Sequence, residues 1–166
     1  KRHAASDGRI AFNITEEAPR LSGLAWNAKR ELLATSGFSQ RALRLFGPDG
    51  VPQGDALNTN TWSYTVAWDG AGDEVLLSTG WFVNRFALSP EKRLKLPARR
   101  LFRGSDDVRF LAAHPTKELF ALPAHFSETL QVVDSVCTAV EAHETGPVEV
   151  VSFSPDGRWL AGSTWD

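Results

Sequence analysis

The side chains of this sequence that could act as nucleophiles, general bases or metal ligands are few and scattered. Four histidines and one cysteine occur in 166 residues, and no cluster of them has the spacing of a zinc site. Nucleophilic catalysis needs a serine or cysteine beside a histidine and a carboxylate, for example on a Gly-x-Ser-x-Gly turn, and the chain has no such motif. The sequence therefore predicts no catalytic residue, no metal site and no cofactor.

Pairs of adjacent carboxylates that precede expected first strands offer the remaining chemistry. Such pairs perform general acid and base catalysis when they are held at a fixed separation. Glu16-Glu17 and Asp106-Asp107 both precede expected strands, where we interpret them as solvated charges of surface loops. Cys137 lies in an apolar run, which is typical of a small buried thiol. His114 falls in an expected hairpin turn, and we interpret it as a turn residue.

Charge and hydropathy exclude several classes of partner. The net charge is -2 and the isoelectric point is about 6.1, which gives no overall attraction to nucleic acid or to an anionic membrane. No apolar run approaches the roughly 20 residues that span a bilayer, and no signal-type apolar core follows Lys1-Arg2-His3. A lone cysteine agrees with a reducing compartment. We therefore expect a cytoplasmic protein without membrane contact.

Apolar segments recur with a regular period along the chain. The clearest copy is 148–166, where the turn Ser154-Pro155-Asp156-Gly157 separates two apolar strands. Four segments fit this template, and further strand-like runs follow the first three of them, which gives four strands per whole unit. The anchor residues of the repeat are 42, 45 and 40 residues apart, namely Trp26, Trp68, Ala113 and Phe153. This arithmetic is that of β-propeller blades.

The last unit resembles a known repeat in its residue pattern. The stretch 143–166, HETGPVEVVSFSPDGRWLAGSTWD, resembles the turn-plus-hairpin consensus of the WD40-repeat β-propeller family, and 50–68 resembles the same region. The same Ser-Pro-Asp-Gly motif is also similar to TolB-like propeller repeats, which are the second family that the chain resembles. The resemblance implies an all-β fold, a propeller of four-stranded antiparallel blades with about four WD40-like repeats. WD40 propellers typically have seven blades, so the chain could be part of a larger one.

Aligning the units predicts the blade boundaries within one WD40-like segment, 1–166. The expected parts are the end of a blade at 1–14, whole blades at 20–58, 62–97 and 107–141, and the start of a blade at 147–166. The fourth strand of the second whole blade is expected at 94–96. Three assemblies stay open: strand 9–14 completes the last blade, the chain is a piece of a longer propeller, or two chains associate into one ring. We favour the second assembly, in which the chain is a piece of a longer propeller.

The resemblance also implies a structural role for three residues. Many WD40 blades are tied by a hydrogen-bonded tetrad of His, Ser or Thr, Asp and Trp. Carried onto the last unit, these positions fall on His143, Thr164 and Asp166. We interpret His143 as a strut of its blade and not as a catalytic base. The other units depart from this pattern, so packing must stabilise them.

The fold that the resemblance implies presents loops and a central opening as a wide surface for recognition. The implied function is a non-catalytic scaffold or sensor that binds a protein or peptide, as a module of a longer chain. Exposed aromatic and arginine side chains are the expected anchors for a partner. The candidates are Arg41, Trp62, Trp81, Phe82, Trp165, Arg99, Arg100 and Arg103. For each tryptophan the alternative is packing between sheets.

Two other functions remain as alternatives. The chain could be the propeller domain of a hydrolase, a peptidase or a TolB-like protein, where it would gate or bind substrate. The basic stretch 92–103 could bind nucleic acid or an acidic partner, although Pro97 interrupts it. Charge on an outer strand also prevents edge pairing, so we expect a solvated blade rim here and no nucleic-acid partner.

Overall fold

The computed structural model describes residues 2–3, 10–12, 20–39, 41–123, 128–136 and 138–164; for 2–3, 10–12 and 101–107 it describes the backbone alone. Every regular element in this part of the chain is a β-strand, and all strand pairs are antiparallel. The predicted all-β fold is therefore confirmed.

The strands form three sheets of four strands and two of two strands, each a meander in chain order. The first sheet contains β3 (Leu21–Asn27), β4 (Leu32–Gly37), β5 (Ala42–Phe46) and β6 (Leu57–Asn58). The second contains β7 (Val66–Trp68), β8 (Glu74–Ser78), β9 (Gly80–Ala87) and β10 (Arg99–Val108). The third contains β11 (Ala112–Ala113), β12 (Leu119–Pro123), β13 (Thr129–Asp134) and β14 (Ala139–Glu144). The two-stranded sheets are β1 (Arg2–His3) with β2 (Ile10–Phe12), and the last hairpin, β15 (Val148–Phe153) with β16 (Leu160–Thr164).

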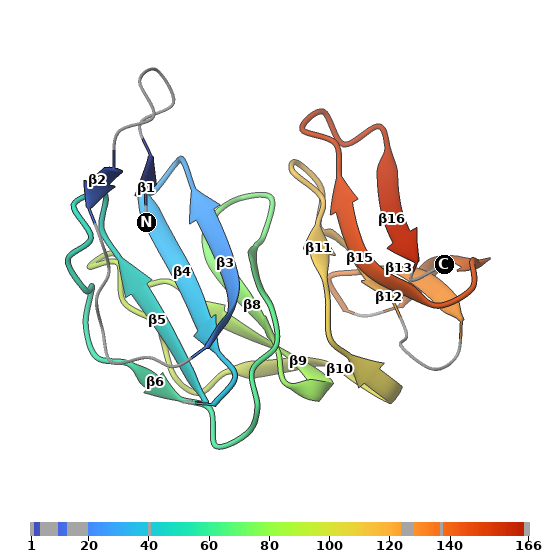
Figure 1. Ribbon diagram of the computed structural model, residues 1–166, viewed down its shortest axis with the longest axis horizontal. Helices are drawn as coiled ribbons and strands as arrows, with labels where there is room; N and C mark the ends of the chain where they lie inside the picture. Colours follow the sequence, from blue (N-terminus) through green and yellow to red (C-terminus); the bar gives the residue numbers. More distant parts are fainter. Residues whose placement is uncertain are drawn as a thin grey trace.

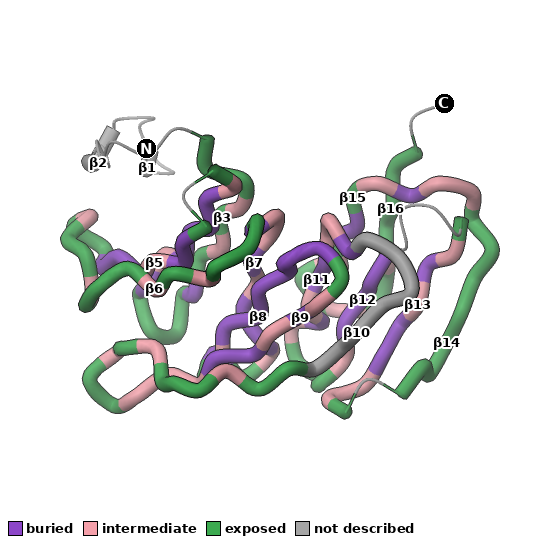
Figure 2. Tube along the Cα trace, turned by 90° about the horizontal axis from the view of Figure 1, so that it is seen from below, coloured by how far each residue is buried: buried purple, intermediate pink, exposed green. Residues whose placement is uncertain are grey.

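In Figure 1 the sheet of β1 and β2 and the first sheet lie toward the left, and the third sheet and the last hairpin lie together toward the right. β2 pairs with β1, and β16 pairs with β15. The alternative in which the N-terminal strand completes the last blade is therefore not the arrangement of this structure. Figure 2 shows which strands are buried: β8 and much of β12 are buried, whereas β14 is exposed along its length.

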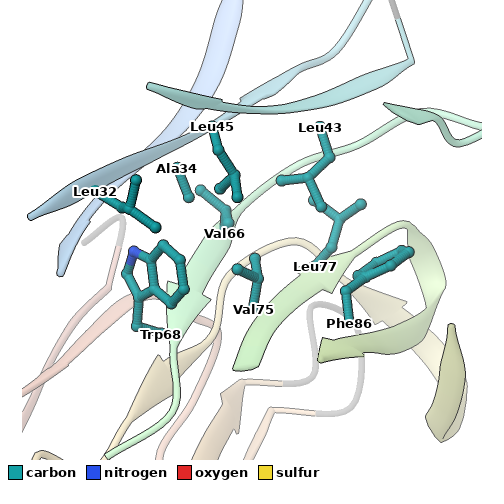
Figure 3. Close-up of a cluster of buried hydrophobic side chains, with 9 residues drawn as sticks. All are labelled: Leu32, Ala34, Leu43, Leu45, Val66, Trp68, Val75, Leu77 and Phe86. Carbon is teal, nitrogen blue, oxygen red and sulfur yellow. The ribbon is translucent and has the colours of Figure 1, made fainter. Parts of the chain in front are cut away.

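Apolar cores fill the spaces between successive sheets. Val75, Leu76 and Leu77 of β8 are all inaccessible to solvent. Val75 and Leu77 join the core against the first sheet, whereas Leu76 joins the core against the third, as the alternation of a strand requires. Figure 3 shows the first of these cores, in which side chains from β4 and β5 meet those from β7, β8 and β9. Full burial of such a side chain contributes about 1.5–3 kcal/mol.

The hairpin turns begin at one repeated position. Trp68, Ala113 and Phe153 are the last residues of β7, β11 and β15, and Trp26 is the last but one of β3. Each pairs with a residue at the start of the next strand. The turns then open with Asn27, Asp69, His114 and Ser154.

One expected strand lies elsewhere. Leu94 makes only an isolated bridge with Leu88, and the fourth strand of the second sheet is β10. A turn that begins at Ser89 occupies the preceding residues, where Ser89 N donates to Arg93 O at 2.8 Å. Pro97 has no N–H to donate to β9, so regular pairing resumes only at Arg99. The expected strand at 94–96 was wrong, because Leu94 makes a single bridge and the strand begins only after Pro97.

Candidate binding site

A pocket of about 540 Å³ opens between the loop 59–64 and the start of β9. The loop joins the first sheet to the second, and the turn at Thr79 and Gly80 joins β8 to β9. Both lie on the lower side of the molecule in Figure 1. We name this site the aromatic pocket and define it by Trp62, Tyr64, Trp81, Phe82 and Arg100.

Hydrogen bonds hold the loop onto the first sheet. Arg41 has a positive φ of 50°, and its carbonyl oxygen accepts the Thr59 N–H at 2.6 Å. The Thr59 hydroxyl lies 2.7 Å from the same oxygen and 2.9 Å from the hydroxyl of the buried Ser63. The hydroxyl of Ser22 donates to the Ser63 carbonyl oxygen at 2.6 Å. The loop that carries Trp62 is therefore fixed at both of its ends.

The rings on the loop side form a stack. Phe38 lies parallel to Trp62, with ring centroids 5.3 Å apart and 23° between the planes. The edge of Tyr64 meets Phe38 at the same centroid distance and 68°. Such pairs contribute about 0.5–1.5 kcal/mol beyond their buried area. Trp62 nevertheless remains 51% exposed, so the stack orients the indole without covering it.

The opposite wall comes from β9 and β10. Gly80 has a φ of 75°, which a residue without Cβ adopts freely, and it turns the chain so that Trp81 is 57% exposed. Arg100 pairs with Asn84 across the strands, and its Cζ lies 4.0 Å from the centroid of the Phe82 ring. This is the geometry of a cation–π contact. Asn84 Nδ2 also donates to Thr79 Oγ1 at 3.1 Å, which fixes the turn.

Four of the expected partner anchors converge in this pocket: Trp62, Trp81, Phe82 and Arg100. Arg41 lies outside the lining and supports the loop through its backbone. Arg99 is tied elsewhere, because its Nη2 donates to the Ser135 carbonyl oxygen at 3.2 Å. The side chain of Arg103 and all of Trp165 lie outside the described residues. The binding role of these eight residues stays a prediction.

The tetrad candidates lie at the other end of the molecule. His143 is exposed on β14, with its Nε2 3.3 Å from Glu141 Oε2, and Thr164 ends β16. Both line a cavity of about 690 Å³ between the third sheet and the last hairpin. Asp166 lies outside the described residues, so the tetrad stays a prediction.

His114 does more than the expected turn role. It is 4% exposed, and its Nδ1 accepts the N–H groups of Thr116 and Lys117 at 3.2 and 3.0 Å. Because Nδ1 accepts, the proton is on Nε2, which donates to the Gly157 carbonyl oxygen at 3.1 Å. The imidazole thus connects the third sheet to the last hairpin and is fully engaged.

A buried charge cluster was not anticipated from the sequence. Arg85 on β9 is 7% exposed; its Nε pairs with Glu74, and its Nη2 donates to Glu118 at 2.6 Å. Asp69 Oδ2 lies 4.0 Å away. Burial is the largest influence and lowers the pKa of Arg85, but the Glu118 hydrogen bond and the three carboxylates together raise it. The three carboxylates balance the charge of this arginine, which joins the second and third sheets. We therefore assign the cluster a structural role.

The described residues contain no group of three or more His, Cys, Asp or Glu side chains that could hold a metal ion. No helix long and apolar enough to cross a membrane occurs among them.

Four-stranded antiparallel meanders stacked face to face in chain order define the class of protein as a β-propeller. Residues 134–166 match the family of the WD domain, G-beta repeat, which supports the predicted resemblance to WD40-repeat propellers. The match runs from the end of β13 across β14, β15 and β16, so the sequence repeat joins the third sheet to the last hairpin. No curated protein matches the chain. WD40 domains typically bind protein partners and are generally not catalytic.

Proposed function

We propose that this chain is a non-catalytic WD40-type module that binds a protein or peptide through the aromatic pocket. The observation that carries the proposal is that Trp62 and Trp81, from two different turns, expose more than half of their side chains at one pocket. Large exposed aromatic side chains that gather at one place mark interaction surfaces, because they supply most of the binding energy of an interface.

The size and the rigidity of the pocket favour this role. Its volume of about 540 Å³ admits one or two side chains of a partner. Phe38 and the Arg41 carbonyl oxygen fix the loop before any partner arrives. Binding then costs little ordering of the site itself.

The chemistry of the lining favours binding over catalysis. The described lining residues include no histidine, cysteine or carboxylate, which are the usual proton-transfer groups and nucleophiles. The alternative of a hydrolase propeller would place catalytic residues elsewhere, and a hydrolase assay on a longer natural chain tests it.

Peptide selection tests the proposal. A displayed library of random heptapeptides is selected on the wild-type chain, and the affinities of enriched peptides are measured for Trp62→Ala, Trp81→Ala and Trp159→Ala. Loss of an anchor typically costs about 2 kcal/mol, or roughly thirtyfold in Kd. Trp159 is the matched control, since it is 71% exposed but lines the other cavity. Enrichment that is insensitive to Trp62 and Trp81, or no enrichment at all, would overturn the proposal.

The nucleic-acid alternative receives less support. In the basic stretch, Arg99 Nη2 donates to the Ser135 carbonyl oxygen, so this cation is engaged with the protein. Binding through this stretch predicts a steep loss of affinity with salt. A titration with single-stranded oligonucleotides at low and high salt checks it.

Self-association is a second candidate, favoured by the outer face of β3. Leu24 is 62% exposed and, by strand alternation, faces away from the core that Ala25 contacts. We propose that this face meets a second copy of the chain. Sedimentation at micromolar concentration should show a dimer that Leu24→Glu dissociates. Val51→Glu, at a 53% exposed valine between β5 and β6, should not dissociate it. A monomeric wild type would contradict this proposed dimer.

The cytoplasmic location of the protein stays a prediction.

A further inference from the structure

The aromatic pocket has a charge of one sign. Arg100 is the one charged side chain among its described lining residues; the others are aromatic rings, glycine, threonines and asparagines. In the part of the chain that the structure describes, the Arg100 guanidinium forms no ion pair, and its contact is the face of Phe82. A guanidinium in this position retains most of its donors for a ligand.

The ring contact also fixes where these donors point. The Arg100 Cζ lies 4.0 Å from the Phe82 centroid, so the flat guanidinium is held over the ring rather than free in solvent. A planar group fixed in this way matches a carboxylate, which accepts two parallel N–H donors. Arg100 and the exposed indoles of Trp62 and Trp81 line the same pocket.

These features exclude the ligand that a cluster of rings alone would suggest. Rings gathered around a pocket attract ammonium groups through their faces. Here a fixed positive charge already occupies the face of Phe82, and the described lining offers no carboxylate to offset a second cation. Like charges at such separations repel, and the repulsion grows as water is displaced.

Resting on the proposed function, we infer that the aromatic pocket selects an acidic peptide segment, in which an Asp or Glu side chain lies next to a large apolar side chain. The carboxylate pairs with Arg100, and the apolar side chain packs between Trp62 and Trp81. The threonine and asparagine side chains of the lining supply neutral hydrogen bonds to the peptide backbone.

The test is a parallel selection of random heptapeptides on three folded chains: wild type, Arg100→Glu and Arg99→Glu. Arg99→Glu is the matched control, because it makes the same charge change one residue away, on a side chain that contacts Ser135 instead. Thermal unfolding of each variant establishes that it is folded. The wild type should enrich peptides with an acidic residue beside an apolar one, and Arg100→Glu should enrich basic residues at the same place.

Affinity measurements complete the test. For a fluorescein-labelled peptide selected on the wild type, replacing its Glu by Gln should weaken binding about tenfold, and replacing it by Lys should weaken binding further. Raising the salt should weaken wild-type binding and leave that of Arg100→Gln nearly unchanged. A phosphoserine in place of the Glu should bind at least as well through the same arginine.

The outcomes separate this inference from the proposed function. Peptides that depend on Trp62 and Trp81 but show no acidic preference retain the proposed function and overturn the inference. An acidic preference that survives Arg100→Glu, or that Arg99→Glu abolishes equally, also overturns it. A selection without enrichment on the wild type contradicts both.

Discussion

Asn27 Nδ2 donates a hydrogen bond of 2.8 Å to the carbonyl oxygen of Gly72, which lies in the equivalent turn of the next sheet. Asn27 Oδ1 meanwhile accepts the N–H groups of Lys29 and Arg30, both at 3.1 Å. His114 repeats this arrangement on Gly157, with a ring nitrogen in place of each amide atom. Asparagine and histidine thus make equivalent contacts in the two turns, because each places an acceptor and a donor on one short side chain.

The first prediction concerns His114. His114→Ala should lower the free energy of unfolding by about 2 kcal/mol or more, because two turn N–H groups and the Gly157 carbonyl oxygen lose their partner. His114→Asn should retain most of the stability, since Asn27 performs the same role. Urea unfolding followed by tryptophan fluorescence measures both. Equal losses for the two variants would show that the side chain acts through packing alone.

The second prediction concerns the glycine that receives this hydrogen bond. Gly157 and Gly146 have φ angles of 71° and 75°, so alanine is strained at either position by about 1–2 kcal/mol. A Cβ at Gly157 would lie 2.4 Å from the His114 ring, whereas one at Gly146 meets nothing within 4 Å. Gly157→Ala should therefore destabilise the chain clearly more than Gly146→Ala.

Calorimetry of the two single variants checks this, and a double variant identifies the cause. Adding His114→Ala to Gly157→Ala should remove the clash, so the double variant should lose less stability than the sum of the two single losses. Additive losses would contradict a direct contact between these residues.

The third prediction concerns Arg85. Arg85→Met should cost about 3–5 kcal/mol, because it leaves Glu74 and Asp69 without their buried counter-charge. Arg30→Met is the matched control: it removes an arginine that pairs with Asp73 at the surface, where such pairs contribute about 0–1 kcal/mol. Chemical denaturation of both variants measures the difference. Similar losses would mean that water compensates the charges around Arg85.

The repeat could be predicted from sequence because it is local. The hairpin around Ser154 to Gly157 combines strand-forming runs with a turn, and both signals lie within about ten residues. The position of β10 could not be predicted from sequence, because the strand begins only after Pro97 and a turn separates it from its partner β9. Nothing in the sequence indicated the cluster around Arg85, because Asp69 and Glu74 of the β7–β8 hairpin meet Glu118, which lies more than 40 residues further along the chain.

The aromatic pocket was predicted in part. Trp62, Trp81, Phe82 and Arg100 were each identified as exposed anchors, but nothing local in the sequence indicates that they meet. They meet because the loop after the first sheet and the turn between β8 and β9 lie at the same end of neighbouring strands. Phe38 and Tyr64, which orient Trp62, come from tertiary packing that a strand pattern does not contain.

The fourth prediction concerns pH and the last hairpin. The Ser154 hydroxyl donates to Asp156 Oδ1 at 2.6 Å, and the Arg158 N–H donates to the same oxygen at 3.1 Å. These bonds, the Ser154 bond first, lower the pKa of Asp156 below its ordinary value of 3.8. A carboxyl whose pKa is lowered by folding stabilises the fold at pH above the ordinary value, and that contribution is lost as the pH falls through the lowered pKa.

Titration of the Asp156 carboxyl carbon by NMR should therefore give a pKa below 3.8 in the wild type and a higher one in Ser154→Ala. Ser154 also accepts the Trp159 N–H at 3.0 Å, so Ser154→Ala removes two bonds of the turn. Asp156→Asn separates the effect of the carboxylate charge from the loss of these bonds. It abolishes the titration at residue 156 but retains a side-chain oxygen that accepts the Ser154 hydroxyl. If Ser154→Ala leaves the Asp156 pKa unchanged, the hydroxyl does not hold the carboxylate, and the Arg158 N–H is the donor that lowers this pKa.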